Sequence, residues 1–449
     1  MGMLRWLQMW ISVTARVGRR DYLVSGALLM GLKYLGEAAL LWFAQGLVLT
    51  PLEFVDPRVT QRVARFGESC AWLVFLWTLP FIWLGLSLSM RRALDAGRST
   101  WVGVLFLVPL VNWLVMGFLA MAPSRPPAAT NPGAAGSAPA RSAVVLAAFA
   151  SSLAIAGVMV AFSIYVLGSY GSSLFVATPV IMGLASAVVA KRYGGLGLGA
   201  ALGIGQTSLL LGMLLLIAVA VEGVICVAMA WVLASPLVAL GGLLGFAIGG
   251  GGGGVPGLLV ALLALPLLAW QESAGRPAAL REVVSAIEVE APPDVVWRHV
   301  VAFPDLPPPD GIFALGIACP LRARIVGEGV GATRYCEFTT GDFVEPITVW
   351  DPPRRLAFDV ASQPPAMREL SPWPDIHAPH LDGYLRSRRG EFRLVALPGG
   401  RTRLEGSTWY QVEVHPQAYW SRWSDLFIHA IHQRVLGHIA RLAAAERSP

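Results

Sequence analysis

The residues best suited to acid–base chemistry lie in the last third of the chain, where all seven histidines occur after residue 280. Three of them, His429, His432 and His438, fall within one stretch, 416–447, whose apolar pattern is helical. At about 100° per residue, His438 lies on the apolar stripe of this helix, whereas His429 lies on the opposite face and His432 to one side. His438 is therefore expected to face an apolar interior. It would serve there either as an acid–base or ligand-binding group, or as a core histidine hydrogen-bonded to a backbone carbonyl.

Patterns that would indicate a metal, a cofactor or a nucleotide are weak. His377 and His380 (HAPH) supply two of the ligands that a metal site needs, but no third ligand lies nearby and the loop is rich in proline. The four cysteines form no CxxC or Cys/His motif. The six glycines at 249–254 are not followed by the lysine of a phosphate-binding loop, and GEGVGA (327–332) is flanked by strand patterns. The sequence therefore assigns no catalytic residue, no metal site and no cofactor.

Alternating apolar residues predict the elements that must position these side chains. Period-two alternation marks four strands, at 283–291, 354–361, 391–397 and 402–414. Helices are expected at 292–303 and 416–447. Residues 280–447 therefore predict an α+β domain in which the long C-terminal helix lays its apolar stripe on a curved antiparallel sheet. An apolar cavity between the helix and the sheet is the expected ligand site.

The side chains expected to line this cavity are mostly aromatic. They are Trp297, Tyr335, Phe338, Trp350, Phe358, Tyr410, Trp420, Phe427 and His438. The stretches IEVEAPPDVVWRHVV, GGRTRLEGSTWY and YWSRWSDLFIHAIHQRVLGHI resemble START-like domains of the polyketide cyclase/dehydrase (SRPBCC) type. The resemblance covers about 280–445 and implies a helix-grip fold whose cavity takes lipids, sterols, polyketides or other apolar molecules. Such folds host binding proteins and enzymes alike, so the resemblance identifies no catalytic residue.

The rest of the chain has the composition of a membrane protein. Only 14% of the 449 residues are charged, and the mean hydropathy is +0.61. Up to residue 279 the chain has 16 basic and 8 acidic residues, and after it 18 and 20. The basic residues of the first part lie beside apolar runs, as membrane topology would place them. This distribution indicates a phospholipid bilayer as partner and argues against nucleic acid.

Eight apolar runs are long enough to cross a bilayer core of about 30 Å. They occupy residues 23–48, 70–90, 101–122, 142–168, 174–190, 196–221, 223–248 and 255–271. The sixth and seventh runs are separate helices only if the chain turns at Glu222; a buried Glu222 would leave seven spans. The Pro/Ala/Gly-rich segment 123–141 is a linker between a three-span domain (1–122) and about five further spans (142–271).

Two short basic turns set the expected orientation. The first contains Arg16, Arg19 and Arg20, and the second, MRRALDAGRSTW (90–101), contains Arg91, Arg92, Asp95 and Arg98. Their arginines place both turns at the cytoplasmic interface. There they either anchor the topology and bind anionic headgroups, or form a functional site together. Eight spans then put the C-terminal domain in the cytoplasm, although the same count puts Lys191 and Arg192 outside.

Residues 1–122 resemble a bacterial inner-membrane family, the domain of unknown function 805. The resemblance rests on RVGRRDYLVSG (16–26) and on SMRRALDAGRSTWVGVLFLVPLVN (89–112), with Thr100 where glycine is usual. It implies a multi-pass protein of the bacterial inner membrane and supplies no chemistry.

The sequence as a whole predicts an α-helical transmembrane bundle of about eight spans, followed by a START-like helix-grip domain in the cytoplasm. The expected function is binding of a hydrophobic or lipid-like ligand. Two alternatives stay open. One is an enzyme of the polyketide cyclase or dehydratase type. The other is a transporter with a regulatory ligand-binding domain, which predicts Lys33, Glu37 and Glu222 around one polar cavity.

Overall fold

A computed structural model describes residues 9–10, 16–107, 111–125, 141–249, 265–272, 278–373, 376, 378–381 and 383–447. The chain divides into two compact units. The membrane unit comprises Met1–Phe162, Val176–Leu268 and Ser371–Ile376. The helix-grip unit comprises Ser163–Phe175, Ala269–Leu370 and His377–Pro449.

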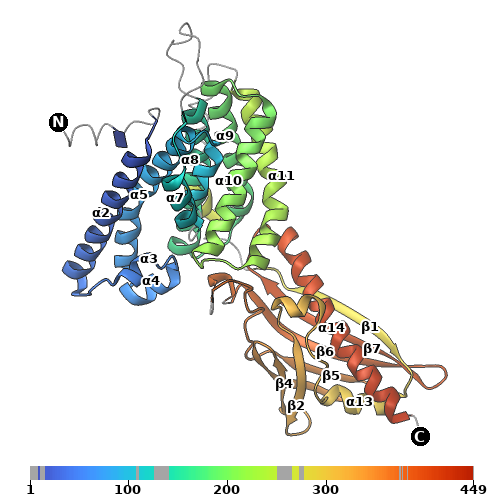
Figure 1. The fold of residues 1–449 in the computed structure, drawn as a ribbon. Helices are drawn as coiled ribbons and strands as arrows, with labels where there is room; N and C mark the ends of the chain where they lie inside the picture. Colours follow the sequence, from blue (N-terminus) through green and yellow to red (C-terminus); the bar gives the residue numbers. More distant parts are fainter. Residues whose placement is uncertain are drawn as a thin grey trace. The chain divides into compact units, whose positions relative to one another are not determined.

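Long apolar helices make up most of the membrane unit (Figure 1). Among the described residues, 6 segments are long and apolar enough to cross a membrane: Arg19–Gln45, Glu68–Asp95, Ala143–Val166, Ser173–Gly194, Leu198–Ala218 and Val224–Ile248. They correspond to α2 (Arg19–Gln45), α5 (Glu68–Asp95), α8 (Arg141–Val160) with η3 (Ala161–Val166), η4 (Ser173–Ala177) with α9 (Thr178–Gly194), α10 (Leu198–Ala218) and α11 (Val224–Ile248). Because α10 ends before Glu222 and α11 begins after it, the chain turns at Glu222, as the two-helix interpretation predicts.

Shorter helices fill the remaining described parts of this unit. Helices α3 (Pro51–Val55) and α4 (Val59–Phe66) connect α2 to α5. The run predicted as one span at 101–122 is divided into α6 (Thr100–Val104), the 3₁₀ turn η1 (Leu105–Leu107) and α7 (Val111–Met121). The sequence has Pro109 between η1 and α7, a residue that cannot continue a helical hydrogen-bond ladder. The run predicted at 255–271 lies mostly outside the described residues.

Glycines bring α9 and α11 into close contact. A Cβ atom on Gly183 of α9 would overlap the carbonyl oxygen of Val238, and one on Gly241 of α11 would overlap the carbonyl oxygen of Val180. Helices in a bilayer associate largely through van der Waals packing, which small residues improve by letting backbones approach. The two glycines therefore fix the contact between these helices.

The helix-grip unit is built on a seven-stranded antiparallel sheet with the order β1-β7-β6-β5-β4-β3-β2. Its strands are β1 (Arg281–Val289), β2 (Pro320–Val326), β3 (Thr333–Phe338), β4 (Gly341–Asp351), β5 (Arg355–Asp359), β6 (Leu385–Leu397) and β7 (Arg401–Val412). The part of this unit that the structure describes also contains the α-helices α13 (Pro293–Val301) and α14 (Gln417–Arg447) and the 3₁₀ helices η5 (Gly311–Leu315) and η6 (Pro379–Leu381).

The core of this unit lies between the sheet and α14, which runs along one face of the strands (Figure 1). Leu436, Ile439 and Ala443 of α14 are fully buried there, together with Leu356 and Leu404 of the strands. Strand β1 follows the predicted alternation, so that Val283 and Val289 face the core and Val284 faces outward. The curled sheet that grips a long C-terminal helix confirms the α+β helix-grip architecture.

Candidate ligand cavity

An apolar cavity lies inside the helix-grip unit between the sheet and α14. Its volume is about 110 Å³, somewhat less than the ~150 Å³ of an engineered protein cavity that holds benzene. Its apolar wall comes from strands and from α14: Phe338, Phe343, Phe358, Phe392, Ile428, Ile431, Val435 and Leu436. A cavity of this size accommodates one ring or one end of a longer molecule.

One ion pair is enclosed in the cavity wall. Arg334 of β3 and Glu345 of β4 are cross-strand partners, and Arg334 Nη1 donates a hydrogen bond to Glu345 Oε2. Their side chains are only 2% and 7% exposed. The guanidinium carbon lies 5.6 Å, 5.3 Å and 5.5 Å from the ring centres of Phe303, Phe358 and Phe392. The cation is thus surrounded by aromatic rings, which attract it electrostatically.

The pair leaves part of the hydrogen-bonding capacity of Arg334 unused. Its Nε atom is buried and has no acceptor among the described residues. A guanidinium remains protonated in proteins, and a buried donor without an acceptor lowers stability. Burial raises the pKa of the Glu345 carboxyl, and the positive charge of Arg334 opposes this shift. The cavity wall therefore presents a buried cation with one free N–H donor.

Two further titratable groups line the cavity, and burial favours the neutral form of both. Burial raises the pKa of the Cys336 thiol to about 12. It lowers the pKa of His432 to about 4. The His432 ring is hydrogen-bonded on both sides, with Nε2 2.8 Å from Thr408 Oγ1 and Nδ1 3.0 Å from Ser285 Oγ. Near neutral pH, neither a thiolate nucleophile nor an imidazolium acid is therefore available from these two residues.

Two of the nine predicted cavity residues, Phe338 and Phe358, line the cavity. Trp297 and Trp350 instead pack edge to face with each other, with 5.7 Å between ring centres. They belong to the hydrophobic core on which the cavity borders.

The other predicted aromatic residues are placed elsewhere in the helix-grip unit. The ring of Tyr335 lies under the Arg324 guanidinium at 4.1 Å. Tyr410 and Trp420 belong to a separate small apolar cluster. Phe427 is half-buried and packs against the preceding tryptophan of α14, with 6.2 Å between ring centres. These four side chains support the fold around the cavity rather than line it.

His432, and not His438, is the histidine that lines the cavity, which corrects the prediction from the helical stripe. His438 is buried, but its Nε2 lies 3.3 Å from the carbonyl oxygen of Pro304 and its ring packs against Phe303. It is therefore a core histidine paired with a backbone carbonyl. The buried face of α14 is rotated from the predicted stripe and consists of Ser421, Ser424, Ile428, Val435, Leu436, His438, Ile439 and Ala443.

The remaining candidate metal ligands of the sequence are placed as follows. His380 lies 3.6 Å from the carboxylate of Glu369, and His377 lies outside the described residues. None of the four cysteines, all of which are described, forms a disulfide bond: Cys70, Cys226, Cys319 and Cys336.

Sequence reasoning missed Arg334, the most distinctive residue of the cavity. In TRYCEF, Arg334 shares one strand face with Cys336 and Phe338 by period two. Its partner Glu345 is buried on the neighbouring strand. Opposite charges at inward positions of adjacent strands were the available signal. It could be recognised only with the pairing register, which a single strand does not reveal.

The two predicted basic turns of the membrane unit differ in exposure. Arg91 and Arg92 are buried, and Arg92 forms an ion pair with Asp95. The Arg98 guanidinium lies 5.7 Å from the ring centre of Phe118. The arginines of the first turn, Arg16, Arg19 and Arg20, are exposed. The second turn is thus largely occupied by protein contacts, whereas the first remains open at the surface.

The predicted transport residues form a local ion cluster. Glu37 is fully buried and pairs with Lys33 on its own helix and with Arg62 of α4, whose Nη1 lies 3.3 Å from Glu37 Oε2. Thr78 of α5 donates a hydrogen bond to Glu37 Oε1 at 3.2 Å. Three neighbours thus neutralise or satisfy this carboxylate. Glu222 lies in the turn between α10 and α11 and is not part of this cluster.

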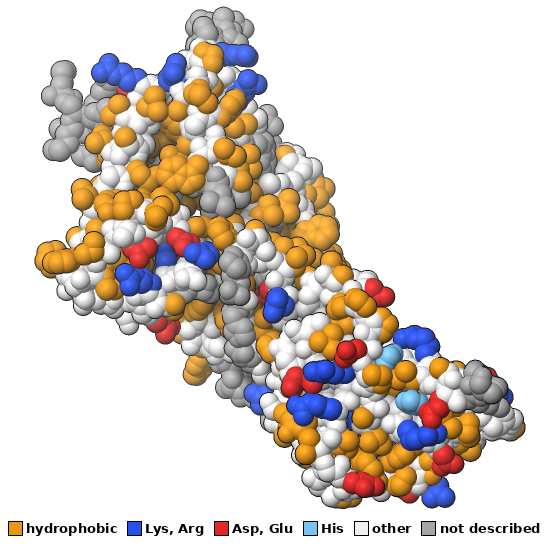
Figure 2. Space-filling model, turned by 60° about the horizontal axis from the view of Figure 1, so that its bottom comes forward, with side chains coloured by type: hydrophobic (Ala, Val, Ile, Leu, Met, Phe, Trp, Pro, Cys, Tyr) orange, Lys and Arg blue, Asp and Glu red, His pale blue; other side chains and the backbone are white. Residues whose placement is uncertain are grey.

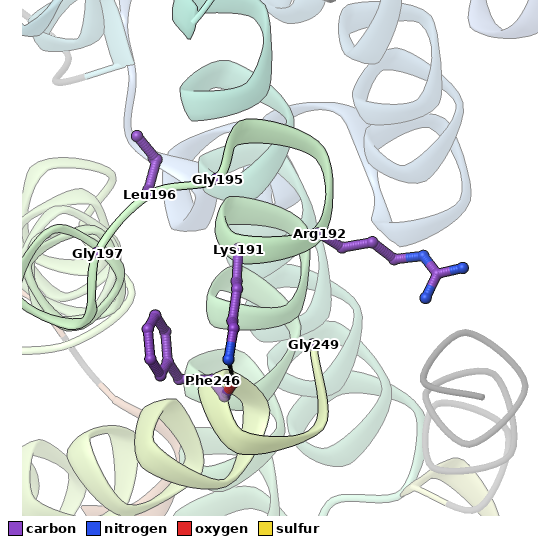
Figure 3. A pocket seen from close by; sticks show the side chains of 7 residues that line it. All are labelled: Lys191, Arg192, Gly195, Leu196, Gly197, Phe246 and Gly249. Atoms are coloured by element: carbon purple, nitrogen blue, oxygen red, sulfur yellow. Dashed lines mark hydrogen bonds between the residues drawn. The ribbon is translucent and has the colours of Figure 1, made fainter. Parts of the chain in front are cut away.

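A larger, open hollow of about 530 Å³ lies at the turn between α9 and α10. Its two cations point in different directions (Figure 3). Lys191 Nζ donates to the carbonyl oxygen of Phe246 at 2.7 Å and lies 4.1 Å from the centre of its ring, whereas the Arg192 side chain extends in another direction. The two cations therefore do not converge on one point of the hollow. Lys191 instead satisfies a carbonyl at the end of α11.

Comparison with known proteins gives different results for the two parts of the chain. Residues 10–130 match the family described as Protein of unknown function (DUF805). Curated proteins give no match. Among solved structures, the chain is similar to a norcoclaurine synthase from Thalictrum flavum, with 14% identity over 39% of this chain and 100% of that chain and a TM-score of 0.27.

Two further solved structures have similar scores. A protein from Thermus thermophilus, TTHA0849, shows 14% identity over 37% of this chain and 100% of its own, with a TM-score of 0.25. The Zhui aromatase/cyclase from Streptomyces sp. R1128 shows 16% identity over 37% and 93%, with a TM-score of 0.24. The chain therefore combines an N-terminal region that matches the DUF805 membrane family with a C-terminal unit of the helix-grip fold.

Proposed function

We propose that this chain is a multi-pass protein of the bacterial inner membrane whose helix-grip unit binds a hydrophobic or lipid-like molecule that carries an oxygen at one end. The buried Arg334 supports this proposal most directly, because its Nε donor lacks an acceptor among the described residues at the wall of an apolar cavity. A ligand oxygen would accept that hydrogen bond. The apolar remainder of the ligand would lie against the phenylalanines of the wall.

Both parts of such a ligand would contribute to affinity. A hydrogen bond to a charged group contributes about 1.5–3 kcal/mol when it replaces an unsatisfied buried donor. Burial of apolar area contributes roughly 25 cal/mol per Å², before the cost of ordering the ligand. The cyclase or dehydratase alternative has less support, since burial favours the neutral forms of Cys336 and His432 and the Arg334 charge is paired with Glu345.

The proposal is tested by mass spectrometry of molecules that remain bound to the full-length protein after purification in mild detergent. The variant Arg334→Met removes the donor and keeps an apolar side chain. The matched control is Arg322→Met on β2, whose side chain is 53% exposed. Loss of about 1.4 kcal/mol or more of binding energy lowers affinity at least roughly tenfold. We therefore expect a molecule that is abundant with the unsubstituted chain and Arg322→Met, and depleted with Arg334→Met.

A second variant reduces the space in the cavity and leaves the Arg334–Glu345 ion pair in its wall unchanged. A Cβ on Gly406 would meet Leu436 at 3.4 Å, which is an ordinary contact, so Gly406→Ala adds a methyl group to the cavity wall without overlap. This variant should lose the same molecule. Bilayer lipids that coat the membrane unit should be equal in all four proteins. Equal amounts of every extracted molecule in all four, with normal elution on size exclusion, would contradict the proposal.

A further inference from the structure

Residues 100–122 are too interrupted to cross a bilayer as one helix. The segment consists of five residues in α6, three in η1 and, after the undescribed residues 108–110, eleven in α7. At 1.5 Å per residue, α7 is about 16 Å long, roughly half of a 30 Å hydrocarbon core.

The two ends of this segment meet. The backbone N–H of Arg125 donates to the carbonyl oxygen of Asp95 at 2.8 Å. The hydroxyl of Ser124 also donates to the Asp95 carboxylate. A single crossing would instead separate its ends by about 30 Å. The chain therefore returns to the level of α5's last turn before it enters the linker.

The first limb of the segment descends along α5. Gly103 lies against the backbone of Met90, and the ring of Phe106 lies against Gly85, more than one helical turn further from the basic turn. The returning α7 contributes Val115 to the cluster that it shares with α5 and α2. The segment thus enters the bundle beside α5 and leaves it at the same end.

The buried arginine of the basic turn closes this loop. Arg92 is fully buried, and its Nε donates to the carbonyl oxygen of Leu119 at 3.0 Å and its Nη2 to that of Ala122. Arg19 of α2 donates to the intervening Ala120 carbonyl at 2.8 Å. The last carbonyls of a helix lack intrahelical partners and carry the negative end of its dipole, so two guanidinium groups stabilise the end of α7.

We infer that residues 100–122 form a re-entrant hairpin, so that the linker after Arg125 lies on the same membrane face as Arg91 to Arg98. The two basic turns have a shared role in this arrangement, because both hold the end of the returning limb.

The hairpin also accounts for the position of Lys191 and Arg192. With eight crossings, these residues face the side opposite the arginine turns. With the hairpin, one crossing is removed before α8, so α8 leaves the arginine-rich face and α9 returns to it with Lys191 and Arg192 at its end. The packing agrees, since Met90 near the basic turn belongs to one core cluster with Ala190 and Leu196.

The surface of the membrane unit has the corresponding charge distribution (Figure 2). Basic side chains gather at one end of the unit, whereas basic and acidic side chains are mixed at the other. The mixed end includes Arg58, Arg62 and Arg65 beside Glu53 and Asp56. An excess of Lys and Arg marks the cytoplasmic face, which assigns the hairpin ends and the linker to the cytoplasm.

Cysteine labelling of the full-length protein in cells tests this inference. Four single substitutions are compared: Ser99→Cys in the basic turn, Ser137→Cys in the linker, Tyr193→Cys after α9 and Gln61→Cys in α4. Each introduced thiol is reacted with a membrane-impermeant maleimide, first in spheroplasts and then in inside-out vesicles. All four substitutions are made in a Cys226→Ala background, which is also the blank, because Cys226 is half-buried whereas Cys70, Cys319 and Cys336 are buried.

We expect the thiols at 99, 137 and 193 to be labelled in inside-out vesicles and the thiol at 61 in spheroplasts. If residues 100–122 cross the membrane, positions 137 and 61 are labelled from one side and position 99 from the other. That result would overturn the hairpin. Labelling of 99 and 61 from the same side would overturn it too, because α5 would then not separate the two faces.

Discussion

Arg334 and Glu345 are two charges buried against each other, so their contributions to stability are coupled. Removal of one partner leaves the other charge buried and unpaired, which costs about 3–5 kcal/mol, whereas replacement of both by apolar residues is often close to neutral. We expect Glu345→Met to lower the free energy of unfolding of the helix-grip unit by roughly that amount, and Arg334→Met combined with Glu345→Met to restore most of it.

Denaturant unfolding monitored by tryptophan fluorescence measures the free energy of unfolding of the single and the double variant. The surface pair Arg401–Glu288, whose side chains are 39% and 59% exposed, supplies the control. Its removal should change the free energy of unfolding by less than about 1 kcal/mol. If the double variant at 334 and 345 is as unstable as Glu345→Met, an unpaired buried Arg334 charge is not the cause of the instability.

His432 makes the stability of the helix-grip unit depend on pH. Burial lowers the pKa of His432 from 6.5 to about 4, so the folded state binds fewer protons than the unfolded chain between these values. Stability is therefore complete above pH 6.5 and falls as the pH decreases towards 4, by up to roughly 3 kcal/mol, since one pKa unit corresponds to 1.36 kcal/mol.

Thermal unfolding between pH 7 and pH 4.5 checks this expectation in the unsubstituted chain and in His432→Gln. The variant should be less stable at pH 7 and should lose a smaller part of its stability on acidification. Gln433→Ala, at an exposed position of α14 next to His432, replaces a residue without a titratable group and is the control that should keep the original slope. An unchanged slope in His432→Gln would show that another group causes the acid sensitivity.

The contact between α9 and α11 depends on a glycine at a defined position. Because a Cβ on Gly241 would overlap the carbonyl oxygen of Val180, Gly241→Ala must push the two helices apart. Overpacking of this kind costs typically 1–3 kcal/mol. Gly203→Ala on α10 is the control, since nothing lies within 4 Å of its added Cβ. Alanine there should be neutral or stabilising, by up to about 1 kcal/mol from helix propensity.

The stability of both variants is measured by heating the purified protein and determining by size exclusion the fraction that has not aggregated. Gly241→Ala should aggregate at a lower temperature than the unsubstituted chain, and Gly203→Ala at the same or a higher one. Equal behaviour of the two alanine variants would mean that the α9–α11 contact does not limit the stability of the membrane unit.

The spacing of apolar residues in the sequence predicts some elements of the helix-grip unit correctly and others incorrectly. Strands β1, β5, β6 and β7 follow from period-two alternation, because one face is dry and the other is wet, whereas β2, β3 and β4 were not predicted in this way. The orientation of α14 could not be derived in this way: Trp420 and Phe427 look like the buried stripe, yet small side chains such as Ser421 and Ser424 lie flush on the sheet. The face that a helix buries depends on the shape of its partner, which its own sequence does not contain.

The hairpin at 100–122 shows the same limit in the membrane unit. Its length and hydropathy equal those of a crossing helix, so composition alone predicts a span. The difference comes from the Arg92 guanidinium and the carbonyls of Leu119 and Ala122, which are 27 and 30 residues away along the chain. Such a non-local contact is invisible to a window of about 20 residues.

Removing one crossing at 100–122 moves every later segment of the chain to the opposite side of the membrane. If each of the six described candidate spans crosses the membrane once, the chain returns to the arginine-rich face after α11. The run at 255–271, predicted from its apolar sequence to cross, would then carry the residues that follow it to the opposite face. The inference of a hairpin thus replaces the cytoplasmic location expected from eight spans with an extracytoplasmic one for the C-terminus.

Paired reporter fusions to the full-length chain and to residue 130 decide this orientation. Alkaline phosphatase is active only outside the cytoplasm, and a green fluorescent protein exported in unfolded form is dark there. We expect the fusion after Pro449 to be active with phosphatase and dark with the fluorescent protein, and the fusion at residue 130 to show the converse. Fluorescence at both positions would instead mean that the run at 255–271 does not cross. The ligand of the helix-grip unit would then be drawn from the cytoplasm, whereas phosphatase activity after Pro449 would make the cell envelope its source.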